Sequence, residues 1–329
     1  MNTIKLNRWG YCEEIDILKG YAILFVLFNH CTPLYLKNIT GFDLWGGMGV
    51  PLFLLIQVFH YYKRGLDKTP AIKPMKVFQR VFVPFLIAET AIILLKWMMG
   101  EPVSESFMGC ISNWGYGSGE YYIWIYLQFV LLLPLTTYIL KKINVRWAPI
   151  AFIGISATFE IICSITNIAE HTYKFLFFRY FFLIYLGYLW AKNDIILNRK
   201  YLLLSIVSVI AILVFDLSGG SFEPFFYDSS WKCFHWISYF YPFALLPIIL
   251  IGLHSRLHKS IRTVITLMGK YSWQIFCLQL VVFSFMSTQV FTFIGNESIR
   301  GVLYMIASIL MSVIPVLLYN KKYINITSR

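Results

Sequence analysis

The sequence predicts an all-α, polytopic integral membrane protein with about ten transmembrane helices. Hydrophobic residues make up 58% of the 329 residues and charged residues 13%, against about 25% charged in ordinary soluble domains. The mean hydropathy of the chain is +0.67. Apolar runs recur from one end to the other, and no polar stretch between them is long enough to fold separately. We therefore expect a single transmembrane domain over residues 1–329.

Ten runs of about 17–25 mainly apolar residues have the length that an α-helix needs to cross the hydrocarbon core. In chain order they lie at 15–35, 44–62, 81–99, 121–140, 148–166, 176–191, 201–217, 237–253, 272–293 and 301–320. No small-residue cleavage site follows the first run, so we interpret that run as a retained span and not as a signal peptide.

The charge of the connecting segments alternates along the chain. Basic residues follow the second, fourth, sixth, eighth and tenth runs, whereas the intervening loops carry acidic residues and few basic ones. Because cytoplasmic loops are rich in Lys and Arg, this alternation predicts both termini in the cytoplasm of a multi-pass plasma (inner) membrane protein. The net charge of +12 is thereby assigned to loops beside the lipid bilayer, and no nucleic-acid partner is expected. The six cysteines show no metal-ligand spacing, although Cys110 and Cys233 fall in outer loops where a disulfide is feasible.

Lys19 and His30 share one face of the first predicted span. Eleven residues at about 100° each amount to three turns plus about 20°, with an axial separation of about 16 Å. Asp16, three residues before Lys19, can form a local ion pair with it. Lys19 alone is compatible with snorkelling to the interface, and His30 alone with a hydrogen bond between helices or with a general base. Together they indicate one wall of a cavity that crosses the membrane.

Other polar residues lie at membrane depth. Arg80 opens the third span, where arginine suits a phosphate clamp or an interfacial anchor. Glu89 and Glu160 fall inside the third and fifth spans, and intramembrane acids usually face a cavity or a partner. The outer loops 101–120 and 218–236 are rich in Gly, Ser and aromatic residues. This composition favours an interfacial aromatic belt, with a platform for a sugar ring as the alternative.

Five segments, in this order, resemble motifs of the acyltransferase-3 family of membrane acyltransferases. They are EEIDILKGYAI (13–23), GVPLFLLIQVF (49–59), KVFQRVFVPFL (76–86), YYIWIYLQFVLLLP (121–134) and MGKYSWQIFCLQL (268–280). The resemblance implies a ten-helix fold that transfers an acyl group, usually acetyl, from acetyl-CoA in the cytoplasm. The acceptor is a hydroxyl of a cell-surface polysaccharide or a lipid-linked glycan precursor, so the implied activity is O-acetylation in the cell envelope.

The resemblance also assigns roles to residues. It implies His30 as the catalytic histidine, and Lys19 and Arg80 as holders of the coenzyme A phosphates, with Asp16 and Lys76 beside them. We assign Gln57, Trp114 and Glu120 to acceptor binding. No metal is expected.

The chain departs from the family pattern at several positions. Lys19 replaces a common arginine, Val77 the first arginine of R-x-x-R, Gln57 a serine, Tyr126 a glutamate and Gln279 a late histidine. Because Tyr126 replaces the glutamate, an acid that orients His30 must come from elsewhere, and the candidates are Glu160, Glu89 and Glu120. Tyr126 or Asn29 is the candidate hydrogen-bond donor to a developing oxyanion.

Two other classes of function compete with this enzyme. A proton-coupled transporter or exporter of a polar solute or glycolipid would also use intramembrane Lys, His and Glu. The sequence shows no inverted repeat and no matched pair of broken helices to support such a carrier. A scaffold within a polysaccharide-synthesis complex is the third possibility.

Overall fold

A computed structural model of the chain describes residues 13–63, 74–144, 146–193, 199–217, 235–286 and 288–327. These residues form helices and connecting turns, and no strand occurs among them. The helices are α1 (Glu13–Cys31), α2 (Leu34–Thr40), α3 (Gly49–Lys63), α4 (Pro74–Val77), α5 (Val83–Met98), α6 (Val103–Ser112), α7 (Tyr121–Lys142), α8 (Ala148–Thr166), α9 (Glu170–Lys174), α10 (Phe181–Asn193), α11 (Arg199–Leu217), α12 (Leu246–Arg256), α13 (Lys259–Lys270), α14 (Ser272–Phe285) and α15 (Glu297–Thr327). The all-helical class predicted from the sequence is confirmed for this part of the chain.

Within the described residues, five helices are long and apolar enough to cross a membrane: Met75–Met98, Tyr121–Lys142, Ala148–Thr166, Trp236–Arg256 and Glu297–Asn320. The other five predicted spans coincide with α1, α3, α10, α11 and α14. Of these, α3, α10 and α14 have 15, 13 and 14 residues, fewer than the roughly 20 that a straight crossing needs. The total of about ten spans therefore stays a prediction.

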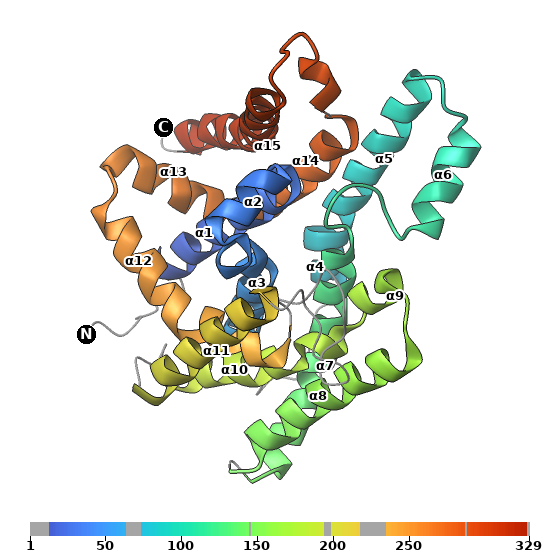
Figure 1. Ribbon diagram of the computed structural model, residues 1–329. Helices are drawn as coiled ribbons and strands as arrows, with labels where there is room; N and C mark the ends of the chain where they lie inside the picture. The colour runs from blue at the N-terminus through green and yellow to red at the C-terminus, as the bar shows by residue number, and fades with distance from the viewer. Residues whose placement is uncertain are drawn as a thin grey trace.

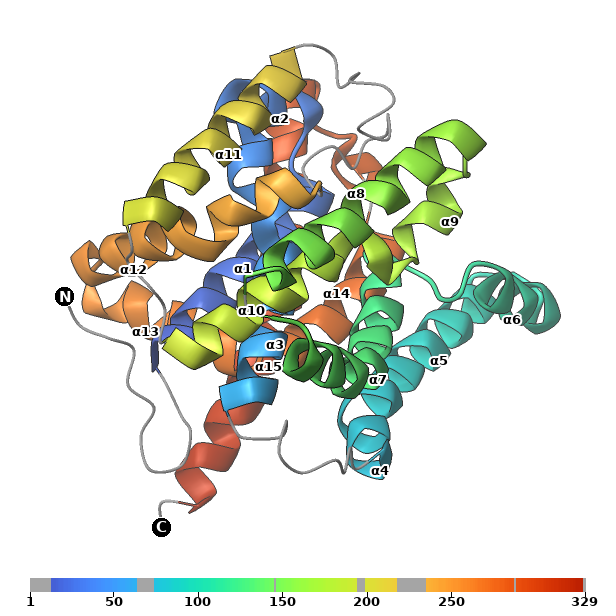
Figure 2. The same cartoon turned by 90° about the horizontal axis from the view of Figure 1, so that it is seen from below.

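α1 and α3 lie near the centre of the molecule (Figures 1 and 2). α1 packs against α13, α3 and α14, and α3 packs against α10. α5 and α6 form an arm that projects to one side of this core (Figures 1 and 2). α14 joins the arm to the core because it contacts both α1 and α5.

The first span ends earlier than predicted, at Cys31 and not at residue 35. Pro33 has no N–H to donate to the carbonyl of Asn29, four residues before it, and the loss of this bond favours the end of the helix here. The Lys37 ammonium donates to that Asn29 carbonyl instead, at 2.6 Å. The ninth predicted span, 272–293, is also too long, because Met286 adopts an extended backbone and ends α14 at Phe285.

Two prolines each follow a π-helical segment that the sequence did not predict. η3 (Phe78–Phe82) links α4 to α5 just before Pro84, which has no N–H for the carbonyl of Arg80. η7 (Tyr241–Leu245) precedes α12, where Pro247 likewise leaves the carbonyl of Phe243 without its helical donor. The indole Nε1 of Trp190 donates to that carbonyl at 2.8 Å. Local widening of this kind often occurs at functional sites, and η3 contains Arg80.

Candidate active site

One cavity of about 610 Å³ lies among the central helices, a volume usual for a small-molecule site, which spans about 300–1,000 Å³. Its walls come from α1, α3, α7, α13 and α14, together with η3 and the loops before α3 and α7. Six residues that the sequence singled out line it: Lys19, Asn29, His30, Gln57, Arg80 and Tyr126. The fold thus gathers residues from four separate sequence segments around one space.

α1 supplies Lys19 and His30, which the sequence placed on one helix face. Lys19 and His30 both line the cavity, and eleven helical residues separate them by about 16 Å along the axis. The predicted ion pair is confirmed, because Lys19 Nζ lies 2.6 Å from Asp16 Oδ1. Asp16 is buried and Lys19 is half-buried. The carboxylate therefore holds the lysine side chain at the cavity wall.

Three cationic side chains line the cavity. Arg80 of η3 and Lys19 of α1 were predicted, and Lys270 at the end of α13 was not. Lys270 directly follows Gly269, one of two glycines at which α13 crosses α1. A Cβ built on Gly269 would overlap the Asp16 carbonyl oxygen, and one built on Gly20 would overlap the Ile265 carbonyl oxygen. Neither glycine has room for a side chain at this crossing, and the residue beside each of them, Lys19 and Lys270, lines the cavity.

His30 lies at the opposite end of α1 from Lys19. Its ring packs against Phe283 at 5.9 Å between ring centroids. The Cβ position of Gly119 lies 3.3 Å from His30 Nε2, so the loop before α7 closely approaches this nitrogen. Among the residues that the structure describes, His30 makes no ion pair with a carboxylate. The imidazole thus lies beside an aromatic ring and the loop backbone, and the Lys37 ammonium is near enough to act on it electrostatically.

The cavity lining also contains buried polar atoms that have no hydrogen-bond partner. Gln57 Nε2 donates to the Tyr126 carbonyl at 3.1 Å. Gln57 Oε1 and Trp273 Nε1 are buried and lack a hydrogen-bond partner. Since buried polar groups are normally satisfied, a ligand or water would fill this capacity. The three cations and these polar groups fit a ligand that is anionic at one end and carries amide groups.

Glu160, predicted as an acid that acts on His30, lies in a different buried cluster. Its carboxylate accepts a hydrogen bond from Tyr173 at 2.6 Å and lies 3.4 Å from His235 Nδ1. Glu160 does not line the cavity. Two short helical turns, η4 (Phe177–Tyr180) and η6 (Trp236–Tyr239), pack against α8, which carries Glu160.

Glu120, Trp114 and Lys76 also lie outside the cavity lining. Glu120 pairs with Lys174 at 2.8 Å. Trp114 is 54% exposed and packs edge-on against Trp124 at 5.2 Å. Lys76 is exposed, one turn before Arg80. The structure therefore does not bring these three residues into the cavity lining.

Glu89, the third candidate acid, contacts the loop before α7. Its Oε2 accepts from the backbone N–H of Tyr116 at 2.8 Å and from the Cys110 thiol at 3.3 Å. Burial, and then the Glu89 carboxylate, raise the pKa of Cys110 to about 12. Cys110 is a free thiol, and Cys233, its suggested disulfide partner, lies outside the described residues together with most of loop 218–236.

Sequence reasoning missed several residues of the lining. Lys270, Ser272, Trp273 and Gln274 all belong to the segment that carried the last motif, but helix periodicity alone did not indicate which of them face inward. Gly119 was missed because a glycine carries no chemistry of its own. Gly119 has a positive φ of +97°, a backbone conformation that favours glycine, and this explains one glycine of the Gly-rich loop 101–120.

Comparison with known proteins gives one family match. No curated protein and no solved structure matches the chain. A family model described as an acyltransferase domain matches residues 13–319, which include all the described cavity-lining residues. The match spans nearly the whole chain, and it includes each of the five segments quoted above. The chain belongs to the acyltransferase-3 family of membrane acyltransferases.

Proposed function

We propose that the cavity binds an acyl-CoA, most simply acetyl-CoA, and that the protein transfers its acyl group to a hydroxyl of a cell-surface polysaccharide or lipid-linked glycan. One observation carries the proposal: Lys19, Arg80, Lys270 and His30 line one continuous cavity. Cations suit phosphates, and the distance of about 16 Å between Lys19 and His30 suits an extended pantetheine arm.

The cationic end is the donor-phosphate site in this proposal. Lys19 is held by Asp16 and reaches the wall beside Lys270, while Arg80 approaches from η3. Two lysines act as point charges and the arginine offers a planar fork of donors. Between the two ends, the free Gln57 Oε1 accepts and the free Trp273 Nε1 donates, so they match the amides of a pantetheine arm.

His30 is the general base at the other end. It takes the proton from the acceptor hydroxyl through a ring nitrogen. The hydroxyl oxygen bonds to the acyl carbon while the carbon–sulfur bond breaks, and the proton passes to the coenzyme A sulfur. A variant of this route has His30 itself carry the acyl group transiently. The thioester supplies the activated acyl group in either route.

The sidedness of the reaction follows from the predicted topology. With both termini cytoplasmic, Lys19, near the start of α1, faces the cytoplasm, where the acyl-CoA is made. His30, near the end of α1, then lies towards the outer face, where the glycan acceptor is found. The plasma membrane is the expected location, because it separates these two substrates.

The test is acyl transfer by membranes that contain the full-length chain. Membranes receive radiolabelled acetyl-CoA, and the label in the polysaccharide and glycolipid fractions is measured. His30→Ala is expected to lower transfer by a factor of at least about 100, the usual contribution of a positioned acid–base group. His258→Asn is the matched control, because His258 is exposed and lies outside the cavity lining.

Three results would contradict the proposal. Full transfer by His30→Ala would exclude the histidine mechanism. Absence of coenzyme A binding to the purified protein would exclude the donor site. Proton flux driven by a polar solute, without coenzyme A, would identify the protein as a carrier instead.

A further inference from the structure

Loop 113–120, between α6 and α7, has an unusual backbone. Trp114, Gly115, Gly117 and Gly119 all have positive φ, at 60°, 130°, 87° and 97°. This region of backbone space is costly for residues with a side chain and open to glycine. The loop therefore has a defined conformation that its three glycines permit.

Two buried side chains outside the loop hold it. The Glu89 carboxylate on α5 accepts from the Tyr116 N–H at 2.8 Å. Gln279 on α14 donates from Nε2 to the Ser118 carbonyl at 3.3 Å. Both side chains are buried. They bond to backbone groups two residues apart, so the loop is fixed from two different helices.

The loop also packs closely on α14. A Cβ on Gly117 would lie 2.8 Å from the Leu280 carbonyl oxygen, and one on Gly119 would lie 3.5 Å from the ring of Phe276. The distance from the Gly119 Cβ position to His30 Nε2 is 3.3 Å. Any residue larger than glycine at position 119 would therefore press on the imidazole.

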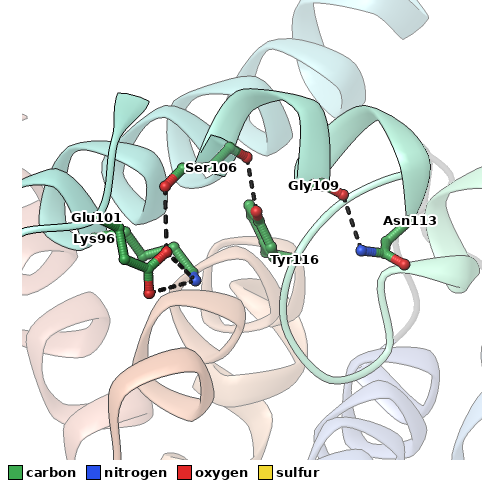
Figure 3. A network of polar contacts seen from close by, with 6 residues as sticks. All are labelled: Lys96, Glu101, Ser106, Gly109, Asn113 and Tyr116. Carbon is green, nitrogen blue, oxygen red and sulfur yellow. Dashed lines mark hydrogen bonds and ion pairs between the residues drawn. The ribbon is translucent and has the colours of Figure 1, made fainter. Parts of the chain in front are cut away.

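A second set of contacts fixes the start of the loop to α6 (Figure 3). Tyr116 donates its hydroxyl to the Ser106 carbonyl at 2.7 Å. Lys96, at the end of α5, bonds both carboxylate oxygens of Glu101, at 3.0 and 2.8 Å. These bonds link α5, α6 and the loop into one unit.

We propose that loop 113–120 is a positioning element for His30, with Gly119 as the contact and Gln279 and Glu89 as its two anchors. The inference extends the proposed function, because His30 is the general base there. In the described part of the chain no carboxylate pairs with His30. The backbone of this loop takes over the orienting role that an acid has in many other histidine-based sites.

The first experiment compares two glycines in the purified full-length protein. Gly119 and Gly100 both have φ +97°, but only Gly119 has neighbours within 4 Å of its Cβ position. Gly100→Ala is therefore a matched control for backbone strain. We expect Gly119→Ala to lower kcat at least about tenfold relative to Gly100→Ala, with the KM for acetyl-CoA within about twofold of the control, because the phosphate-binding cations lie at the other end of the cavity.

The second readout does not need activity. Diethyl pyrocarbonate modifies unprotonated imidazole, and mass spectrometry measures the modification of His30 directly. Gly119→Ala is expected to slow this modification because the new methyl group lies beside Nε2. Gln279→Leu, which removes the bond to Ser118, is expected to accelerate it. Gln279→His keeps a donor and is expected to retain the wild-type rate, while Ser284→Ala on the same helix, which loses only a bond to Leu280, is the control.

Different results would contradict the positioning role of loop 113–120 and the catalytic role of His30. If Gly119→Ala and Gly100→Ala behave alike in kcat and in His30 modification, the loop does not position His30. If Gln279→Leu does not fold, the glycine pair alone decides. If His30→Ala keeps full transfer while Gly119→Ala still changes His30 modification, the contact stands and the catalytic role is wrong.

Discussion

Lys270 is the residue that the structure adds to the proposed donor-phosphate site. We expect Lys270→Ala to weaken coenzyme A binding by about tenfold, because one hydrogen bond to a charged group contributes about 1.5 kcal/mol. An acetyl-pantetheine, which lacks the nucleotide phosphates, should bind the variant as well as the wild type. Titration of purified protein with each compound measures the difference. Lys259→Ala, exposed at the other end of α13, is the control, and equal losses for both compounds would contradict a phosphate contact.

Cys110 provides a pH test of the Glu89 anchor. Burial and the Glu89 carboxylate raise the pKa of this thiol from its usual 9.0 to about 12. Only the thiolate is alkylated, so at pH 8 the reactive fraction falls from about a tenth to about one in ten thousand. We expect alkylation of Cys110 to be roughly a thousandfold slower than that of a solvated thiol at this pH, and to rise with pH up to about 12.

The Glu89→Gln variant separates the effect of burial from the effect of the Glu89 carboxylate on the pKa of Cys110. It removes the negative charge beside the thiol but keeps an oxygen that can accept from the Tyr116 N–H. Alkylation of Cys110, followed by mass spectrometry, should be faster in the variant than in the wild type. An unchanged rate would mean that burial alone raises the pKa of Cys110.

At the residue scale, the sequence predicted what helix geometry controls within one segment. Lys19 and His30 lie on one cavity wall because eleven residues bring the chain back to the same face. The ion pair between Asp16 and Lys19 follows from the same rule. The surroundings of Glu160 could not be predicted, because Tyr173 of α9 and His235 come from separate segments that only tertiary packing brings to α8.

At the element scale, the crossing of α1 and α13 depends on two glycines. A Cβ on Gly269 would overlap the Asp16 carbonyl, which is backbone and cannot rotate away. We expect Gly269→Ala to lower the free energy of unfolding by about 1–3 kcal/mol, as overpacking does. We also expect it to shift the next residue, Lys270, within the cavity lining. Gly252 of α12 has open space around its Cβ position, so Gly252→Ala should be neutral or stabilising by up to about 1 kcal/mol.

Denaturant unfolding of the purified protein in one detergent compares these two variants. A Gly269→Ala protein as stable as Gly252→Ala would mean that α1 and α13 can separate without cost. The affinity of the same samples for coenzyme A is then measured. We expect the Gly269→Ala protein to bind it more weakly, because α1 and α13 each contribute a lysine to the cavity lining.

The sequence located the helices well and their ends less well. Runs of apolar residues identify a span because the bilayer requires them, and each of the ten predicted ranges coincides with a helix. Pro33 ends α1 early, and Pro84 and Pro247 each follow a π-helical segment. Which carbonyl a proline frees can be read from the sequence. Which side chain then bonds the freed carbonyl depends on the fold. Lys37 bonds that of Asn29, and Trp190 bonds that of Phe243.

At the scale of the whole molecule, orientation in the membrane decides whether the proposed reaction is feasible. The basic loops predict that Lys259 is cytoplasmic and that Glu105 of α6 is external. In a chain whose native cysteines are replaced, a membrane-impermeant maleimide should label Glu105→Cys in intact cells. It should label Lys259→Cys only after the membrane is opened. Both side chains are exposed in the structure, so burial would not explain a negative result. The opposite pattern would place Lys19, Arg80 and Lys270 on the outer side, away from cytoplasmic acetyl-CoA. His30 would then face the cytoplasm, and the transfer of an acyl group outward along α1 would be impossible.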